Sequence, residues 1–462
     1  MQIYNTATHR KEEFIPITPG QVKLYACGPT VYDYFHIGNA RAFLFFDVVR
    51  RYLEYRGYDV TYVQNITDID DKIIARSLEE GIPFDEFAAK YSRAFLEDAA
   101  ALGIKPPHHQ PRATEVMPAI IDLISQLVEL GYAYEAEGDV YFDTARLPEY
   151  GSLSGKRIED QKAGARVAEN TLKRNPSDFT LWKNSKPGEP VWESPWGLGR
   201  PGWHSECVVM SQSILGQTFD IHGGGVDLVF PHHENEQAQA YAISGKPLAN
   251  YWLHNGFLNI EGEKMSKSLD NFFTTRDILT QHSAEAIRFF FLSKHYRSPI
   301  DFNREIIAES ERAIDNFRNS LSDIDYLNLP ADEGYLQELE SFEAEFIRAM
   351  DDDFNSAKAI AVLFDLNSRI RNQGLEPSQR QNAARMLVRL GSVLGFFQNL
   401  AAELSFSLPD LSIQLIELLI AYRDQARADK NWALSDKIRD DLAALGITLK
   451  DTPTGCVWSH KE

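Results

Sequence analysis

The sequence predicts an α/β protein whose parallel sheet is split by an insertion and followed by helices. Apolar runs typical of buried strands alternate with amphipathic helical stretches over residues 20–125, and the same alternation returns over 201–260. The stretch between them, 126–200, breaks the pattern. From about residue 303 onward, strand patterns nearly disappear and apolar residues recur at helical spacing. We therefore expect a sheet domain in two halves, then a helical bundle and a small α+β module.

The first strand is expected at residues 22–26, where apolar and polar side chains alternate. Cys27-Gly28-Pro29 ends this strand, because glycine and proline turn the chain. A helix then begins at His36-Ile37-Gly38-Asn39 and closes at Gly57. Backbone N–H groups and the positive end of the helix dipole point to one place in such an arrangement, which favours a phosphate ligand.

The second strand, at residues 60–63, ends in the polar loop 65–71. Ligands of open parallel sheets bind at the carboxyl ends of the strands, so Thr67 and Asp68 are placed to contact one. Asp70 can instead cap the helix that follows. A ligand contact and a helix cap both stay open for this loop, and different residues of the loop can serve the two roles.

The insertion carries a short strand at 138–143, and its segment 185–201 is dense in Pro, Gly and Trp. That composition is typical of a surface segment and not of a sheet core. After it we expect a helix over 203–215 and a strand over 219–222 that leads into three glycines. A helix over 231–242 follows, with proline near its first position.

Helical periodicity then continues through four stretches, which are 306–317, 335–350, 354–370 and 377–397. The segment 401–410 is the best linker candidate. The module from residue 412 to residue 462 is expected to hold two helices and a strand at 446–450.

Composition limits the classes of protein that fit. A chain of 462 residues holds about three to four domains. The N-terminal stretch shows no basic region followed by an apolar run, and nothing reaches the roughly 20 apolar residues of a membrane span. Three cysteines are few and odd in number, which fits a reducing compartment. We expect a cytoplasmic protein that has no contact with membranes.

The formal net charge of −20 argues against a nucleic-acid partner. It does not exclude one, because a local basic track is enough for binding and net charge says nothing about distribution. RNA binding by such a protein would depend on a few well-placed contacts.

Two motifs resemble the signatures of class I aminoacyl-tRNA synthetases. His36-Ile37-Gly38-Asn39 stands where that class has His-Ile-Gly-His, and Lys264-Met265-Ser266-Lys267-Ser268 is its second signature unaltered. Asn39 departs from the class pattern, since its amide donates hydrogen bonds but cannot titrate. Further matches over nearly the whole chain narrow the resemblance to the cysteinyl-tRNA synthetase family.

The resemblance implies a Rossmann-type parallel-sheet nucleotide-binding domain, split by an insertion. Because the chain holds about four domains, we expect a monomer. The implied parts are the first half of the catalytic domain (1–125), the connective insertion (126–200), the second half (201–260), a linker domain around the second signature (261–302), the helical bundle (303–400) and an anticodon-binding module (401–462).

Four residues match the zinc ligands of that family, namely Cys27, Cys207, His232 and Glu236. Two thiolates, an imidazole and a carboxylate are typical of tetrahedral zinc. From the residues alone, His232 and Glu236 share a face of the expected helix, but no Cys-x-x-Cys occurs. Buried cysteine is often an inert small hydrophobe, and His232 can equally be a cap.

Zinc binds a thiolate strongly and an alcohol weakly, so the metal would separate cysteine from serine without an editing site. Gly28, Thr67 and Trp203 match family positions around the amino acid, and the alternative for Trp203 is a place in the core. His233 and Glu234 are expected to point elsewhere on their helix. The sequence assigns no role to His204, His222 or His233.

The resemblance also implies a reaction in which the carboxylate of L-cysteine attacks the α-phosphate of ATP, with Mg²⁺ accompanying the nucleotide. The 2′-hydroxyl of the terminal adenosine of cysteine tRNA then takes the acyl group. The implied catalytic residues are His36, Asn39, Lys264 and Lys267. The implied ATP contacts are Lys267, His36, Asn39, Gly38, Gly225 and Asp227. Without the resemblance, we would expect Lys264 and Lys267 to belong to a solvated loop.

The C-terminal module matches family positions that meet the anticodon at Arg427, Trp432, Asp436 and Asp451. Aromatic and basic side chains suit base stacking and phosphate contact, and the alternative is a solvated helix with Trp432 in a core. Two rival functions stay open. One is a cysteine ligase of the same superfamily with a small amine acceptor, which should lack this module. The other is a non-catalytic regulatory paralogue, against which the intact second signature speaks.

Overall fold

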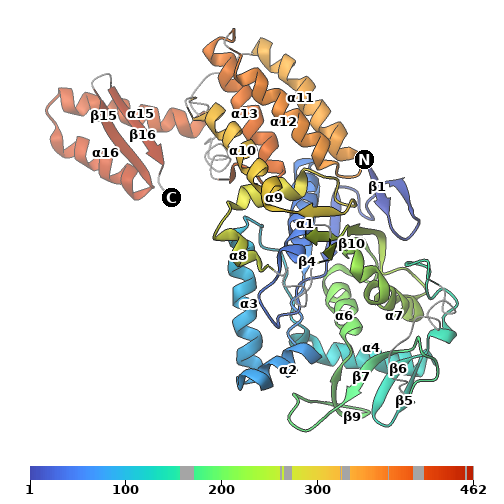
Figure 1. Cartoon of the computed structure of the whole chain (residues 1–462). Helices are drawn as coiled ribbons and strands as arrows, with labels where there is room; N and C mark the ends of the chain where they lie inside the picture. Colours follow the sequence, from blue (N-terminus) through green and yellow to red (C-terminus); the bar gives the residue numbers. More distant parts are fainter. Residues whose placement is uncertain are drawn as a thin grey trace. The chain divides into compact units, whose positions relative to one another are not determined.

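The computed structural model describes residues 1–156, 171–260, 263–264, 273–322, 324, 333–372, 374–398, 410–452 and 455–460. The chain forms two compact units, Met1–Gln398 and Asn399–Glu462 (Figure 1), and each is described by itself. The finer boundaries that the sequence sets inside the first unit stay predictions.

A four-stranded parallel sheet lies at the centre of the first unit, which confirms the α/β prediction. In spatial order its strands are β11 (Ala249–Asn255), β10 (Phe219–Gly225), β3 (Gln21–Ala26) and β4 (Asp59–Gln64). The two halves of the domain meet where β10 pairs with β3. All four strands are largely buried, as is typical of parallel strands that are covered on both faces.

Strand β10 is longer than predicted, because the three glycines after residue 222 belong to it. A Cβ atom on Gly223 would lie 2.1 Å from the ring of Phe46, and one on Gly224 would lie 3.0 Å from His233. Glycine is therefore needed here for close approach of neighbouring elements to the sheet and does not end the strand.

Helices pack on both faces of this sheet. On one face, α1 (Ile37–Tyr55) brings Phe46 against β10. On the other face, a core that includes Tyr25 is shared by α4 (Met117–Glu129), α6 (Trp203–Leu215) and α7 (Glu234–Ser244). Further helices of this part are α2 (Asp71–Glu80) and α3 (Phe84–Ala101).

Helix α7 runs over Glu234–Ser244, and the predicted start at Pro231 lies in the preceding segment, Val229–His233, which is kinked at Phe230. Asp70 caps α2, since its carboxylate accepts a hydrogen bond from the Lys72 backbone N–H at 2.8 Å. The cap interpretation of Asp70 is thus confirmed.

The insertion forms a five-stranded antiparallel sheet, which lies at the opposite end of this unit from α11–α13 (Figure 1). Its strands in spatial order are β5 (Ala133–Ala136), β6 (Asp139–Phe142), β7 (Phe179–Asn184), β9 (Gly197–Pro201) and β8 (Trp192–Ser194). The sequence did not predict the strands β8 and β9 within 185–201; β8 is the edge strand of this sheet, and its residues and the first two of β9 are not buried, as expected of a surface segment. A Cβ atom on Gly199 would lie 2.3 Å from the carbonyl oxygen of Lys183, so glycine lets β9 approach β7.

Shorter elements join the sheet domain to the bundle. A three-stranded sheet has the order β13 (Glu263–Lys264), β12 (Leu258–Ile260) and β14 (Ile300–Phe302). Helices α8 (Thr275–Leu279) and α9 (Ala284–Leu292) lie between β13 and β14 in the chain. The hairpin of β1 (Gln2–Asn5) and β2 (Arg10–Glu13) begins the chain.

The predicted helical region is confirmed by four helices, which are α10 (Arg304–Leu321), α11 (Glu333–Asp351), α12 (Ser356–Ile370) and α13 (Pro377–Val393). The second unit consists of α15 (Asp410–Ala428), α16 (Trp432–Ala444), β15 (Ile447–Thr452) and β16 (Gly455–His460). The sequence predicted its two helices and β15 but missed β16, which pairs antiparallel with β15.

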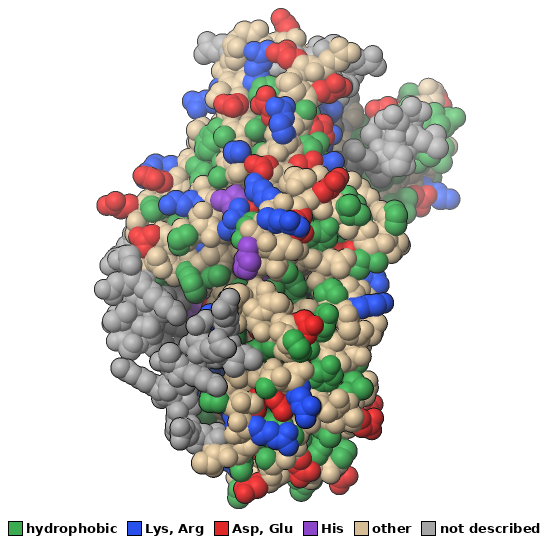
Figure 2. Space-filling view, turned by 90° about the vertical axis from the view of Figure 1, so that its right-hand side faces the viewer, with side chains coloured by type: hydrophobic (Ala, Val, Ile, Leu, Met, Phe, Trp, Pro, Cys, Tyr) green, Lys and Arg blue, Asp and Glu red, His purple; other side chains and the backbone are tan. Residues whose placement is uncertain are grey.

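Figure 2 shows acidic and basic side chains interspersed over one face of the molecule. Among the helices of the described residues, none combines the length and apolar character that crossing a membrane would require.

Candidate active site

Candidate site residues gather at the carboxyl ends of β3 and β10. Cys27 follows β3 directly, and its backbone N–H donates to the carbonyl oxygen of Gly223 at 3.0 Å. Gly28 comes next, where a Cβ atom would lie 1.7 Å from the carbonyl oxygen of Asn65. Only glycine therefore lets the loop after β3 pack against the loop after β4.

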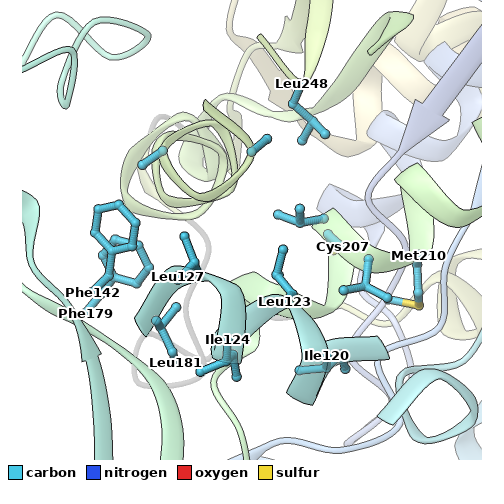
Figure 3. Close-up of a cluster of buried hydrophobic side chains, with 14 of the residues drawn as sticks. Ile120, Leu123, Ile124, Leu127, Phe142, Phe179, Leu181, Cys207, Met210 and Leu248 are labelled. Atoms are coloured by element: carbon cyan, nitrogen blue, oxygen red, sulfur yellow. The ribbon is translucent and has the colours of Figure 1, made fainter. Parts of the chain in front are cut away.

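Four predicted ligands come together in one buried cluster. Ligand atoms of Cys27, Cys207, His232 and Glu236 all lie within 4.8 Å of one another, and all four residues are buried. The two Sγ atoms are 4.0 Å apart, and Cys207 Sγ lies 3.7 Å from His232 Nε2. Cys207 and Met210 of α6 belong to one buried hydrophobic cluster with Ile120 and Leu123 of α4 (Figure 3), so apolar core lies next to the ligand candidates.

This donor set fits a tetrahedral metal ion. Zinc bonds to sulfur of about 2.3 Å place two thiolates about 3.8 Å apart in a tetrahedron, close to the observed separation of 4.0 Å. Glu236 Oε1 lies 3.8 Å from Cys27 Sγ and 2.8 Å from His232 Nε2. A metal ion would replace the proton between Glu236 Oε1 and His232 Nε2.

A second set of ligand atoms overlaps the first, because Cys27 and Glu236 also lie with His222 and His233 within 4.8 Å. The expectation that His233 points elsewhere was wrong, since His233 Nε2 lies 3.2 Å from Cys27 Sγ. The chain is kinked before α7, where Phe230 has extended backbone angles, and the side chains of His232 and His233 both reach the cluster. Glu234 does point away, and accepts hydrogen bonds from two backbone N–H groups of the insertion.

Further histidines hold the ligand candidates in place. His222 Nε2 lies 2.7 Å from Glu236 Oε2, and the Nδ1 atoms of His204 and His232 are 3.0 Å apart. His233 contacts His254 at 2.7 Å, and no pattern in the sequence points to His254, because it lies inside strand β11. Such contacts orient metal-binding imidazoles and carboxylates.

Electrostatics favour charged donors in the cluster. Burial alone would raise the pKa of Glu236, but the neighbouring His232 and His222 outweigh it and hold this pKa well below its usual value. Burial opposes the cationic form of His232, yet Glu236 and Cys207 raise its pKa to about 10. The contact with Cys27 lowers the pKa of the Cys207 thiol to about 6, while burial raises the pKa of Cys27. A thiolate and a carboxylate are the forms that bind a metal.

The three residues expected around the amino acid border this cluster. The Trp203 ring stacks on the His232 ring, with centroids 4.0 Å apart and planes at 17°. The Thr67 backbone N–H donates to the carbonyl oxygen of Pro29 at 3.0 Å, so Thr67 lies beside the loop of Gly28. Asp68 is bound instead by Thr114, whose hydroxyl donates to it at 2.7 Å.

The residues expected to contact ATP lie at the ends of α1 and β10. His36 caps α1, and its Nδ1 accepts from the Asn39 backbone N–H at 3.2 Å; Gly38 stands between them in the first turn. Asp227 follows β10, and a Cβ atom on Gly225 would lie 2.4 Å from its Oδ1. The backbone of Lys264 belongs to β13, whereas the Lys264 side chain and all of Lys267 lie outside the described residues.

Residues expected to meet the anticodon lie in the second unit. Arg427 is in the last turn of α15, and Trp432 begins α16 with 58 % of its surface exposed, which excludes the alternative of a core position. Asp436 forms an ion pair with Arg439 at 3.1 Å. Asp451 belongs to β15, and its side chain lies outside the described part.

Solved structures of similar fold include aminoacyl-tRNA synthetases at low identity. A methionyl-tRNA synthetase of Mycobacterium tuberculosis with methionyl-adenylate matches with a TM-score of 0.58 at 15% identity, over 81% of this chain and 90% of that one. A LeuRS of Agrobacterium radiobacter K84 in a ternary complex with tRNA and LeuAMS gives 0.60 at 12%, over 85% and 87%. A putative arginyl-tRNA synthetase from Campylobacter jejuni gives 0.56 at 14%, over 81% and 92%. These likenesses show the fold.

Family matches cover most of the chain. Residues 13–312 match the catalytic domain of class I (C) tRNA synthetases, residues 345–398 match the DALR domain, and residues 409–458 match the anticodon-binding domain of cysteinyl-tRNA ligase. With these domains in this order, and with the cluster and the helix N-terminus described above, the chain belongs to the class I (C) family of tRNA synthetases and is an aminoacyl-tRNA ligase.

Proposed function

We propose that this protein is a cysteine–tRNA ligase, which activates L-cysteine with ATP and transfers it to cysteine tRNA. The observation that carries the proposal is the buried set of Cys27, Cys207, His232 and Glu236, in which Cys27 directly follows β3 of the parallel sheet. The match of residues 409–458 to the anticodon-binding domain of cysteinyl-tRNA ligase supports the choice of amino acid. We expect the protein to act as a monomer in the cytoplasm.

The four-residue cluster would hold one zinc ion. Bound there, zinc would supply affinity for a thiolate over a hydroxyl, which is the difference between cysteine and serine. The ring of Trp203, stacked on His232, would close the site on one side and limit the size of the side chain that enters. The loops that carry Gly28 and Thr67 would contact the rest of the amino acid.

The activation step joins the cysteine carboxylate to the α-phosphate of ATP and releases pyrophosphate, with Mg²⁺ accompanying the nucleotide. His36, Asn39, Lys264 and Lys267 would stabilise the negative charge that spreads over the phosphate oxygens. The first turn of α1 adds backbone N–H groups and the positive end of its dipole. Gly38, Gly225 and Asp227 would contact the nucleoside.

In the second step the 2′-hydroxyl of the terminal adenosine of the tRNA attacks the activated carbonyl, and AMP leaves. Arg427, Trp432, Asp436 and Asp451 would contact the anticodon. The exposed indole of Trp432 supports this assignment, because an aromatic face in solvent can stack on an unpaired base. The presence of this unit also favours tRNA over a small amine as the acceptor.

The test is aminoacylation of total tRNA with labelled cysteine and, in parallel, with labelled serine. We expect cysteine to be charged and serine to be activated less efficiently by a factor of at least about 10⁴, as a site that recognises one functional group allows. Comparable charging of both amino acids, or no charging by a protein loaded with zinc, would contradict the proposal.

A further inference from the structure

The guanidinium of Arg41, at the start of the second turn of α1, joins this helix to two loops of the first unit. Arg41 is 2 % exposed. Its Nη1 donates to the carbonyl oxygens of Gly256 and Phe257 at 2.7 and 2.6 Å. Its Nη2 donates to those of Tyr296 and Ser298 at 3.0 and 2.5 Å. Burial lowers the pKa of Arg41 to about 10, so the group stays charged at neutral pH. One rigid fork thus holds four backbone acceptors.

Each of these loops leads into a strand of the small sheet. Phe257 directly precedes β12, and the second loop precedes β14, which pairs with β12 in parallel. On the other side of β12, the backbone of Lys264 in β13 lies opposite Asn259. Arg41 therefore holds the starts of two strands of the sheet on which the second signature begins.

The two loops pass each other too closely for a side chain. The Gly256 backbone N–H donates to the carbonyl oxygen of Tyr296 at 2.8 Å. A Cβ atom on Gly256 would lie 2.6 Å from the carbonyl oxygen of Arg297 and 2.9 Å from that of Ser298. The four carbonyl groups can therefore face one guanidinium only while residue 256 is glycine.

The chain also returns to α1 after the second signature. The Ile37 backbone N–H donates to the carbonyl oxygen of Phe273 at 3.1 Å, and the Thr275 N–H donates to that of Phe35 at 2.9 Å. The described segments on both sides of residues 265–272 are thus tied to the start of α1, the first by Arg41 and the second by backbone pairs.

We propose that Arg41 is a positioning residue for the activation step, which sets the small sheet carrying Lys264 against the helix turn of His36 and Asn39. The inference rests on the proposed function. Stabilising charge on a transferring phosphoryl group requires that the donors stand at fixed places, and a misplacement of about 1 Å costs on the order of a hundredfold in rate. Arg41 itself touches neither the metal cluster nor the amino-acid residues among its described contacts.

The experiment compares Arg41→Lys with wild type in the full-length, zinc-loaded protein by cysteine-dependent ATP–pyrophosphate exchange. An ammonium keeps the charge but cannot span four acceptors in a fork. We expect kcat to fall by roughly tenfold to a hundredfold, while KM for cysteine and the zinc content stay at the wild-type values.

The matched control is Arg288→Lys. Arg288 is a buried guanidinium too, 1 % exposed, and it donates to Asp47 and to the carbonyl oxygens of Leu102, Gly103 and Leu394. It contacts none of the four acceptors of Arg41. This variant should lose thermal stability to a similar degree while kcat stays near wild type, which separates positioning from general loosening of the fold.

Gly256→Ala provides a second variant that leaves Arg41 intact but forces the two loops apart. It should show the same fall in kcat at unchanged KM for cysteine, and it decides the question if Arg41→Lys folds poorly. Wild-type kcat in either variant, or a fall no larger than that of Arg288→Lys, overturns the positioning role alone. A wild-type protein that exchanges no pyrophosphate with cysteine overturns the proposed function and this inference together.

Discussion

The sulfur atoms of Cys27 and Cys207 lie 4.0 Å apart among buried imidazoles. Two thiols so close cannot both ionise without compensation, and the pKa values reflect this, since that of Cys207 is lowered to about 6 while that of Cys27 is raised. A divalent cation removes the conflict by binding both as thiolates. The local chemistry of the pair is therefore what one expects of metal ligands and not of inert core cysteines.

Replacing Cys207 by serine should remove the metal while the fold survives, because serine nearly preserves the volume but binds zinc weakly. We expect zinc affinity, measured by competition with a chromogenic chelator, to fall by at least about a hundredfold. Cys456→Ser is the matched control, since Cys456 is a half-buried thiol in the second unit. Equal zinc content in both variants would refute the assignment of Cys207.

How far the site was predictable differs between its residues. The spacing of His232 and Glu236 indicates a shared face, and the structure places both in the cluster. The expectation for His233 was wrong, because helical spacing alone places it on another face than His232 and Glu236, whereas its Nε2 lies 3.2 Å from Cys27 Sγ. The pairing of two cysteines 180 positions apart came only from family resemblance, since no local pattern encodes a contact between β3 and α6.

Among the elements, strands buried on both faces were the easiest to predict and glycine-rich strands the hardest. Apolar and polar residues alternate in β3, and β4 is rich in β-branched and aromatic residues, which no helix period explains. β8 and β9 lie in a segment rich in Pro and Gly, for which local propensity predicts a loop. Their pairing depends on tertiary contact, since the glycine at 199 lets β9 approach Lys183 of β7. Tertiary contacts therefore outweigh the low β-propensity of glycine where two strands must approach each other closely.

Helix α1 is fixed to α9 by a buried ion cluster that makes a separate prediction. The Asp47 carboxylate accepts from Arg51 Nε at 2.8 Å and from Arg288 Nη1 at 2.7 Å. Asp47→Asn leaves two guanidinium groups without their carboxylate, and should destabilise the first unit by about 3–5 kcal/mol. The exposed pair of Asp352 with Lys11 is the control, and Asp352→Asn should cost at most about 1 kcal/mol. Thermal unfolding measures both.

The same cluster sets a dependence on pH. Burial alone would raise the pKa of Asp47, but Arg288 and Arg51 outweigh it and lower this pKa below its usual value of 3.8. A carboxyl with a lowered pKa in the folded state contributes stability above its unfolded pKa and loses it as the pH falls through the folded pKa. The difference in unfolding temperature between wild type and Asp47→Asn should therefore be constant above about pH 5 and shrink below about pH 4. A difference that grows on acidification would contradict this account of the cluster.

For the whole molecule, a net charge of −20 must be reconciled with an RNA partner. Acidic and basic side chains are interspersed on the face seen in Figure 2, so the acidic excess there is not gathered into one patch. Binding then depends on local contacts more than on a general field. The exposed indole of Trp432 is a contact of this kind, because stacking on a base does not depend on net charge.

The division of the chain at Gln398 allows activation and tRNA reading to be separated. All candidate residues for the metal, the amino acid and ATP lie in Met1–Gln398, and the second unit has a core of its own, formed by Ile416, Ile420, Leu442 and Ile447.

A protein that ends at Gln398 should therefore keep cysteine-dependent pyrophosphate exchange within about twofold. It should lose aminoacylation efficiency by at least roughly tenfold to a hundredfold, since each lost base stack contributes about 1–3 kcal/mol. Trp432→Ala in the full chain should reproduce part of that loss without changing exchange. Undiminished charging by the shortened protein would remove the second unit from tRNA recognition, and loss of exchange would show that the first unit does not hold the complete activation site.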